Sequence, residues 1–575
     1  MKSIWSLPTA DPAASQSLAA ALGIGPLAAR VLCHRGFAGP EAARRFLHPS
    51  PDHLHHPRLL RGMDLAVERL ARAIRAGEKI LIYGDYDVDG AISVVLLTKA
   101  IELAGGSAAY HVPHRLKDGY GMRSEVVEAA AAAGVGLIVS VDTGIRAAEV
   151  VQRAAALSID VIVTDHHLPE SELPPALAVL NPNRPDCPYP EKNLCGAGVA
   201  FKLAQALLET LPWPAEKRRR VAESLLKLVA IATVADVVPL TGENRVIVKF
   251  GLDGLRDVRN PGLRALLEVA GFAAGAAPSA RQVAYQIAPR LNAAGRMDTA
   301  RDAVELFLTQ DPARAAELAR SLEEHNTGRR QVEAELGEVC ERVAVDAAEC
   351  ALVYYNENWH RGVIGIVASR LVERFHRPVF VLGRNPEDGL AQGSGRSIPA
   401  FHLLDALESM SDLFVRFGGH EYAAGVTLDP ARVDEFRRRF NARAAACLQP
   451  ADLLPRIEID ALADPADLSG PNIAEVFALA PFGHGNPLPT FATLAVEVAS
   501  VAPLGKDGKH VKLNLRSGSG ALTVKAWNFA SRAHELAPRS HVDVAFTLEE
   551  DAYSAARGYP GWAAKLRDVR PAVTS

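Results

Sequence analysis

Acidic and histidine residues gather at four points of this sequence, and each point lies at or near the end of a short apolar run. Side chains of these types bind divalent metal ions and act on phosphate esters. Because the carboxyl ends of parallel strands meet at one edge of a sheet, we expect them to converge. The residues are Asp85, Asp87 and Asp89, then Asp142, then Asp165, His166 and His167, and finally Asp236.

So many carboxylates in one place repel one another, and the repulsion is costly unless cations neutralise it. Magnesium and manganese are hard ions that prefer carboxylate oxygen, and manganese accepts imidazole more readily. Side chains two residues apart in an extended segment point to the same side, so Asp87 and Asp89 can each reach a different ion. The sequence therefore predicts a site for two divalent ions, Mn²⁺ or Mg²⁺, that holds a phosphodiester between them.

The segments around these residues predict a parallel α/β sheet. Short β-branched runs at 79–83, 108–112, 137–141 and 160–163 are separated by helical stretches such as 91–104 and 123–133. Residues 195–310 are mostly helical. The proline-free stretch from Ala313 to about Val345 predicts a long helix linking two lobes, with Gly328 as an expected irregularity.

The second half of the chain predicts two further domains. A second α/β unit begins at 351–355 and includes helices at 362–374 and 430–446 around a strand at 378–382. From about residue 453 the pattern becomes that of short strands with turns, which predicts a small Greek-key barrel of the OB type. The expected strands of this barrel are 456–460, 491–501, 511–515, 522–527 and 542–548.

Length and composition limit the class of protein to which the chain can belong. A chain of 575 residues with 49% hydrophobic and 23% charged residues is expected to be globular with several domains. The first residues lack a signal-peptide pattern, and no apolar run reaches the roughly 18 residues of a membrane span, so we expect a cytoplasmic protein without membrane contact. Six cysteines without a C-x-x-C pair argue for free thiols rather than structural zinc. The net charge of −4 does not itself indicate nucleic-acid binding, and the run 217–220 is interpreted as a solvated helix face.

The motifs also resemble a known family. Asp165-His166-His167, together with the run Gly84 to Gly90, resembles the signature of the DHH phosphoesterases. The segments 289–297 and 481–491 resemble the branch of this family whose members are bacterial 5′→3′ exonucleases specific for single-stranded DNA. The resemblance extends over roughly 60 to 570, nearly the whole chain.

The resemblance implies a role for each residue of the cluster. It implies that Asp87 and Asp89 each bind one ion, that Asp142 bridges both, and that His166 and Asp236 complete the second. Asp85 either binds directly or supports a ligand from behind, and Asp165 orients the histidines. His167 either contacts the scissile phosphate or protonates the leaving group. All of these residues are present, unlike in inactive relatives.

Other motifs of the family imply contacts with the substrate phosphates. Arg115 is expected near the 5′ end, where its planar fork suits phosphate, although an ordinary surface position is the alternative. Asn292 and Arg296 are expected to neutralise the scissile phosphate, with Arg290 as a further phosphate contact. The glycines at 194–202 either let a helix approach a ligand or serve packing.

The second α/β unit resembles the DHH-associated domain (DHHA1), through the motifs 359–370, 393–397 and 418–425. Arg396, Ser397 and His420 are its expected substrate contacts, with a structural role as the alternative for His420. In the barrel, a basic face for a single strand is expected from Lys506, Lys509, Lys512, Lys525 and Trp527. Trp527 fits a core position equally well.

We therefore predict an α/β multidomain protein: an N-terminal helical segment (1–55), a parallel-sheet DHH domain (56–312), a long connecting helix (313–345), a DHHA1 domain (346–450) and an OB-fold barrel (451–575). The predicted function is two-metal hydrolysis of single-stranded DNA from the 5′ end, releasing mononucleotides in repair and recombination. The family further suggests a monomer with two partners, a single-strand binding protein and a RecQ-type helicase. Two alternatives remain, a small-substrate enzyme of the same family and a non-catalytic DNA-binding scaffold. The barrel argues against the first, and the complete ligand set against the second.

Overall fold

The computed structural model describes residues 3–8, 11–114, 119, 121–297, 300–342, 346, 348–505, 508–518, 520–558 and 560–572, without the side chains of 296, 297, 341, 552 and 553. The chain forms two compact units. One contains Met1–Ser50, Pro239–Gly242 and Pro455–Ser575, and the other contains Pro51–Val238 and Glu243–Leu454. Among the described residues no single helix can cross a bilayer by length and hydropathy; α1 (Pro12–Leu22) and α2 (Pro26–His34) pass that test only as a pair, bent by 120°.

The larger unit begins with a sheet of five parallel strands. Their order is β3 (Ala108–His111), β2 (Lys79–Tyr83), β4 (Val135–Val141), β5 (Asp160–Thr164) and β6 (Ala178–Leu180). Counted along the chain this order is 2-1-3-4-5, so the connections change direction between β2 and β4. The prediction of a parallel sheet is confirmed, and β6 is a short fifth strand beyond the four that were expected.

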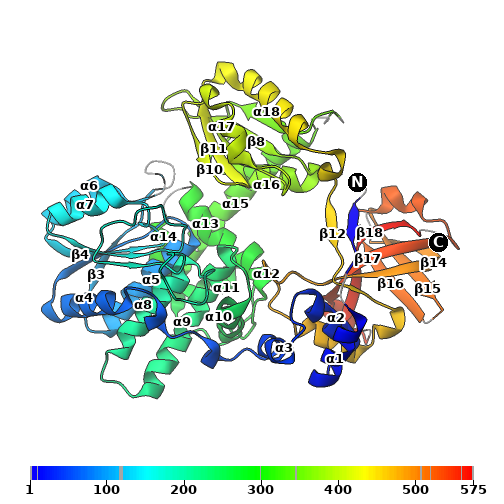
Figure 1. The fold of residues 1–575 in the computed structure, drawn as a ribbon, viewed down its shortest axis with the longest axis horizontal. Coiled ribbons are helices and arrows are strands. Elements are labelled where there is room, and N and C mark those ends of the chain that lie inside the picture. The colour runs from blue at the N-terminus through cyan, green and yellow to red at the C-terminus, as the bar shows by residue number, and fades with distance from the viewer. Residues whose placement is uncertain are drawn as a thin grey trace. The chain divides into compact units, whose positions relative to one another are not determined.

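Helices cover both faces of this sheet (Figure 1). On one face, the side chains of Leu81, Val161 and Val163 pack with those of α6 (Ser124–Ala132) and α7 (Ala148–Ala156). On the other, α4 (Met63–Ala76), α5 (Val88–Leu103) and α8 (Gly196–Glu209) contact the strands. The strands are thus covered from both sides, which explains their nearly continuous apolar sequences.

Helices follow the sheet and lead to a long connecting helix. They are α9 (Ala215–Ala235), α10 (Gly242–Gly254), α11 (Pro261–Val269), α13 (Ala288–Met297) and α14 (Arg301–Leu308). The connecting helix α15 (Pro312–Arg342) is 31 residues long and contacts α11, α13 and α14 near its start. Gly328 lies inside it without interrupting it, so the irregularity expected there is absent.

A second sheet follows α15, in the order β10 (Arg416–Gly419), β11 (Ala423–Leu428), β9 (Ala391–Arg396), β8 (Val379–Arg384) and β7 (Leu352–Asn356). Only β7 and β8 run parallel, joined by α16 (Ile364–Phe375). Phe380 and Leu382 face α18 (Val433–Cys447), whereas Val379 and Val381 face α16. The two helices therefore lie on opposite faces of this sheet (Figure 1).

The smaller unit is a closed barrel. Strands β14 (Thr490–Leu504), β15 (His510–Ser517), β16 (Gly520–Ala526), β18 (Trp562–Pro571) and β17 (His541–Glu550) pair in this order, and β17 closes on β14. The prediction of an OB-type barrel is confirmed, with one correction to its strands. The expected strand at 456–460 is β12 (Arg456–Glu458), which pairs with β1 (Ile4–Ser6) outside the barrel, and the fifth barrel strand is β18.

The N-terminal segment belongs to the same unit as this barrel. Helices α1, α2 and α3 (Pro40–Leu47) share a hydrophobic cluster with barrel residues such as Phe491 and Val544. Arg35 forms an ion pair with Asp460 at 2.8 Å and also donates to Asn486 and to the carbonyl of Pro487. The segment predicted only as helical thus completes the core of the C-terminal domain.

Candidate metal centre and its surroundings

The predicted metal-binding residues converge where the sheet of β2 to β6 changes winding direction. Asp85 and Asp87 follow β2, and Asp89 lies in the first turn of α5. Asp142 follows β4, and His166 and His167 follow β5. Asp236 is the C-cap residue of α9, so it reaches the cluster from the end of a helix rather than from the end of a strand. Ligands of doubly wound sheets bind at this crevice, so the fold itself explains the convergence.

His166 lies at the centre of the cluster. Its Nε2 is 3.2 Å from Asp142 Oδ1, 3.7 Å from Asp236 Oδ2 and 3.9 Å from Asp89 Oδ2. The cluster contains three overlapping groups of three residues, and within each group the ligand atoms lie within 4.8 Å of one another. The groups are Asp89, His166 and Asp236; Asp142, His166 and His167; and Asp85, Asp87 and Asp142. Asp142 is common to two groups and His166 to two, an arrangement in which one carboxylate can face two ions.

The carboxylates repel one another in a buried setting. Burial, and then the charge of Asp87, raises the pKa of Asp89 to about 7. Burial, and then the charges of Asp89 and Asp87, raises the pKa of Asp236 to about 9. Burial and the same neighbours raise the pKa of Asp142 well above its usual range. Burial lowers the pKa of His166 to about 4, which leaves its imidazole neutral. A neutral imidazole next to carboxylates that repel one another electrostatically is a set of ligands suited to divalent cations.

The N-terminus of α8 holds Asp89 in place. The backbone N–H groups of Gly196 and Ala197 donate to its two carboxylate oxygens at 2.6 and 2.7 Å. A Cβ at position 196 would lie 2.5 Å from Asp142 Oδ1, so only glycine allows the helix to come this close. The glycines at 194–202 were expected either to let a helix approach a ligand or to serve packing; the structure shows Gly196 letting α8 approach two carboxylates of the protein itself.

Asp142 has a strained backbone. Its φ is 58°, in the left-handed region that asparagine and aspartate tolerate better than other non-glycine residues. Its N–H donates to the carbonyl of Thr164 at the end of β5, and the residue is only 2% exposed. Such conformations cost of order 1–3 kcal/mol and are retained where the surroundings impose them, commonly at functional sites.

Asp165 organises both histidines. It is fully buried and accepts hydrogen bonds from the backbone N–H groups of His166 and His167 and from His167 Nδ1, the last at 2.7 Å. Burial alone would lower the pKa of His167, but the bond to Asp165 and its charge raise it. This contact places the proton on Nδ1 and turns Nε2 away from Asp165.

Two asparagines that the sequence analysis did not single out support the histidines from behind. Asn181 donates to the carbonyl of His167 at 2.8 Å, and Asn183 donates to that of His166 at 2.6 Å. Both follow β6, in the run Asn181-Pro182-Asn183. In the sequence, polar residues directly after a fifth apolar strand could have indicated these two asparagines. The strand β6 is only three residues long, however, and its apolar run is too short to be recognised.

Helix α13 packs against the loop of the metal cluster. Asn292 Oδ1 accepts from the N–H of Val88 at 3.3 Å, and a Cβ at Gly295 would lie 2.7 Å from the carbonyl of Tyr86. Arg290, a predicted phosphate contact, is 9% exposed and forms an ion pair with Glu323 of α15. Its guanidinium thus has an internal partner, which does not favour the phosphate role. The side chain of Arg296 lies outside the described residues.

Three of the remaining predicted contacts lie in the DHHA1 domain. Arg115 lies outside the described residues. Arg396 ends β9, with its Nη1 bonded to Ser394 Oγ at 3.0 Å, and Ser397 Oγ donates to the carbonyl of Phe401 at 2.6 Å. His420 is exposed in the turn between β10 and β11. Arg396, Ser397 and His420 lie close together, because Arg396 pairs with Ala423 across the sheet.

In the barrel, part of the expected basic face is exposed. Lys512 of β15 and Lys525 of β16 are directly opposite one another, and Lys525 also pairs with Asp551 at 2.5 Å. Trp527 is 50% exposed and its ring contacts that of His510, so the core alternative for this residue is wrong. Lys509 is exposed as well, whereas Lys506 lies outside the described residues.

Three family models match the chain in the order of its domains. The model described as the DHH family, N-terminal domain, matches residues 79–233, the DHHA1 domain matches 348–446, and the RecJ OB domain matches 459–559. Among curated proteins, the single-stranded-DNA-specific exonuclease RecJ of Bacillus subtilis is 38% identical over 94% of this chain and 68% of its own length. The exonuclease of the same name from Dickeya dadantii is 43% identical over 84% of this chain and 85% of its own.

Solved structures agree with these matches. RecJ of Thermus thermophilus in complex with Mn²⁺ superposes with a TM-score of 0.84 at 33% identity, covering 99% of this chain and 80% of that one. The complex of the same protein with Mg²⁺ superposes with a TM-score of 0.78 at 32% identity and covers 99% of this chain and 79% of that one. Both ions are those that the donor set of the cluster favours.

Proposed function

Because the chain belongs to the RecJ branch of the DHH phosphoesterase family, we infer that it is an exonuclease specific for single-stranded DNA and dependent on divalent metal ions. The observation that carries this proposal is the intact cluster at the crevice between β2 and β4. Three groups of ligand atoms overlap there, because Asp142 belongs to two of them and His166 to two. The barrel supports a polymeric substrate, because OB-folds bind single strands along a groove.

We propose that Asp87, Asp89, Asp142, His166 and Asp236 hold two divalent ions, with Asp85 as a further ligand or a support for one. The fit rests on the raised pKa values of Asp89, Asp142 and Asp236, whose mutual repulsion a cation would relieve. When bound, such a pair of ions favours a water nucleophile and offsets the charge that develops on the phosphate and the leaving oxygen.

The protein's own groups then position the substrate. Asp165 fixes the ring of His167 through Nδ1, so Nε2 is the nitrogen available to touch the scissile phosphate or give a proton to the departing oxygen. Asn181 and Asn183 hold the backbone of the two histidines, and α8 holds the carboxylate of Asp89. We propose that Asn292 acts by holding the loop at Val88, with Arg296 as the phosphate contact.

Finer features of the function stay predictions. They are the 5′→3′ direction, the release of mononucleotides, the setting in repair and recombination, the phosphate contacts of Arg115, Arg396, Ser397 and His420, and the boundaries proposed for the five parts of the chain. A helicase of the RecQ type, a single-strand binding protein, a monomeric state and a cytoplasmic location are proposals of the same kind. Each follows from the family and from the sequence, and each has its own test.

The function is tested by digesting an end-labelled single-stranded DNA of about 40 nucleotides with manganese, beside its duplex and an RNA of the same sequence. We expect mononucleotides to be released from the 5′ end of the single strand while the duplex is spared. Turnover of di- to tetranucleotides without degradation of the long strand would instead indicate a small-substrate enzyme. Tight binding without any hydrolysis would indicate a scaffold.

A further inference from the structure

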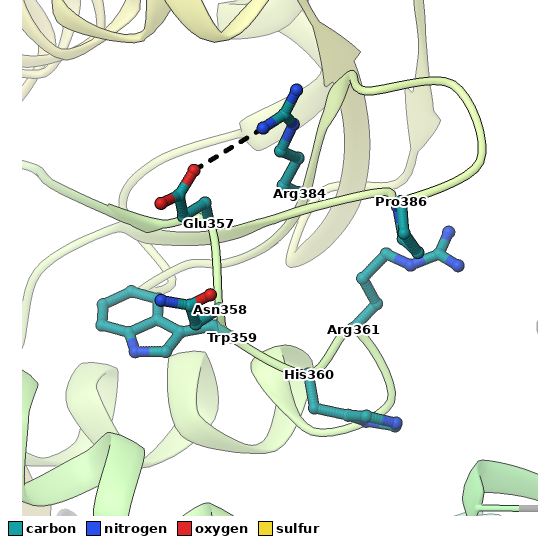
Figure 2. A pocket seen from close by; sticks show the side chains of 7 residues that line it. All are labelled: Glu357, Asn358, Trp359, His360, Arg361, Arg384 and Pro386. Atoms are coloured by element: carbon teal, nitrogen blue, oxygen red, sulfur yellow. Dashed lines mark ion pairs between the residues drawn. The ribbon is translucent and has the colours of Figure 1, made fainter.

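A pocket of about 620 Å³ lies in the DHHA1 domain, apart from the motifs Arg396-Ser397 and His420. It is lined by Glu357, Asn358, Trp359, His360, Arg361, Arg384 and Pro386. Figure 2 shows these side chains around the pocket, with Trp359 and Asn358 on one side and Arg361 and Pro386 on the other. The volume is in the range of sites that bind a nucleotide-sized ligand.

The pocket lies at the carboxyl ends of the two parallel strands of this domain. Five of its residues form the loop between β7 and α16, and Arg384 is the last residue of β8. This is the position at which open α/β sheets bind ligands. Helix α16 has 12 residues and no acidic residue in its first turn, so its N-terminus adds to the positive potential of the loop before it.

The lining residues offer an aromatic surface and two arginines. Trp359 packs on a cluster that includes Leu336 of α15, which fixes the indole, and it is only partly buried. Arg361 is held at the rim by its bond to Gln392 Oε1 at 2.6 Å. Aromatic faces stack nucleobases, and guanidinium groups bind phosphate with two parallel hydrogen bonds.

The charges of the pocket favour an anion. Arg361 and Arg384 give two positive charges, and the carboxylate of Glu357, 3.6 Å from Arg384, gives one negative charge, so the sum is +1. Burial, and then the charge of Arg361, lowers the pKa of His360, which keeps its ring neutral. The pair of Glu357 and Arg384 is exposed, and a phosphate can displace such a pair at little cost.

Gln392 connects this pocket with a second one of about 370 Å³ on the same sheet. That pocket is lined by Gln392, Arg416, Gly418 and Gly425, among others. Gln392 pairs with Thr427 of β11, which in turn pairs with Arg416 of β10, so the three side chains project from the same face. Polar groups therefore extend across the sheet from Arg361 through Gln392 to Arg416.

We propose that the pocket at the ends of β7 and β8 is a nucleotide-binding subsite, with Trp359 stacking a base and Arg361 and Arg384 binding the adjoining phosphates. The proposal rests on the proposed function, because the continuous polar face identifies the nucleotide as part of the single-stranded DNA substrate. A free nucleotide has the same chemistry and is the other source that an experiment must separate.

The first test measures binding of a labelled 30-nucleotide single strand to the full chain in chelator, by fluorescence anisotropy. The double variant Arg361→Gln/Arg384→Gln should bind at least about tenfold more weakly. The slope of log affinity against log salt should fall by about 1.4, as expected for two lost contacts with a single strand. Trp359→Leu should weaken binding at least about fivefold while Trp359→Phe retains it, because stacking needs a ring.

The matched control is Arg438→Gln, which removes an exposed arginine of α18 in the same domain that does not line the pocket. It should leave affinity and salt slope unchanged. With manganese, the double variant should raise KM for the long strand but not for a tetranucleotide, with kcat kept for both. Loss of deoxythymidine monophosphate binding in equilibrium dialysis, with unchanged strand affinity, would assign the same subsite to a free nucleotide.

Unchanged binding of both the strand and the mononucleotide in the double variant and in Trp359→Leu would overturn the subsite. Arg384 is exposed, so Arg384→Gln alone keeps this test valid if the double variant does not fold. Failure of the proposed function has a different signature, since the unaltered chain itself would then leave the long strand intact with manganese, whatever it does to the tetranucleotide.

Discussion

Asp142 is the residue on which most constraints of the metal cluster meet. It belongs to two of the three groups of ligand atoms, contacts His166, and has a left-handed backbone conformation. Burial, and then repulsion from the charges of Asp89, Asp87 and Asp85, raises the pKa of its carboxylate. Backbone strain and repulsion between carboxylates both cost free energy at Asp142. A bound divalent ion that uses this carboxylate as a ligand explains why both are retained.

We predict that Asp142→Asn lowers manganese-dependent nuclease activity by at least about a hundredfold, the scale of loss when a group that stabilises developing charge is removed. Asparagine tolerates a φ of 58°, so the fold should be retained. The measurement is the initial rate of mononucleotide release, with circular dichroism to confirm folding.

The control for Asp142 is Asp186→Asn, a carboxylate of the same domain that is 48% exposed and pairs with Arg184. It should keep its activity. A folded Asp142→Asn protein that cleaves as fast as this control would contradict the bridging role of Asp142.

At the residue scale, the sequence could predict the types that form the cluster but not what holds them. Asp85 to Asp89, Asp142 and His166 were visible because strand ends converge in a parallel sheet. The contacts of Asn181 and of the Gly196 N–H depend on how β6 and α8 approach the loops, and no local pattern encodes that approach. Arg290 was predicted to bind phosphate, but its contact with Glu323 arises only when α15 packs on α13.

At the scale of elements, helix α8 is part of the site. Its first two N–H groups bind the carboxylate of Asp89, and its first residue touches Asp142. Helix N-termini favour negative charge, so the two N–H groups of α8 fix the carboxylate and offset part of the rise in its pKa that burial and the charge of Asp87 cause.

We predict that Gly196→Ala weakens manganese binding by about ten- to a hundredfold, as altered supports of ligands commonly do. The added Cβ would lie 2.5 Å from Asp142 Oδ1, so α8 or Asp142 must move. Isothermal titration with manganese measures the loss. Gly337→Ala in α15, where a Cβ meets open space, is the control and should bind manganese normally. Equal affinities of the two variants would show that α8 has no part in the site.

The N-terminal helices are a second element whose role the sequence did not indicate. We predict that Arg35→Ala destabilises the barrel by about 3 kcal/mol, because it leaves the largely buried Asp460 without its partner. The more exposed pair of Arg30 and Asp467 provides the comparison, and Arg30→Ala should cost about 0.5 kcal/mol. Urea unfolding measures both. Losses below about 0.5 kcal/mol for both variants would contradict a structural role of the segment in the barrel.

Most helices and strands follow from the sequence because their apolar periods are long. The strands that were not predicted include β1 and β6, which have three residues each, the glycine-rich β9 to β11, and β18, whose sequence is interrupted by charged residues. β18 forms because it lies between β16 and β17 and completes the barrel. Strands of this kind are defined by their neighbours rather than by their own pattern.

At the scale of the whole molecule, one chain combines a metal cluster, a DHHA1 sheet with two pockets and a barrel with an exposed basic face. Of these three parts, the barrel is the one that an enzyme for short substrates does not need. Its presence favours a polymeric substrate, whose phosphates supply many weak contacts.

The most direct test of the account is the number of manganese ions bound per chain, measured by isothermal titration on chelator-treated protein. We predict two ions for the unaltered chain, and at most one for Asp142→Asn, because a shared ligand supports both positions. One ion or none on the unaltered, folded chain would contradict the two-metal centre and leave the buried repulsion among Asp89, Asp142 and Asp236 unexplained.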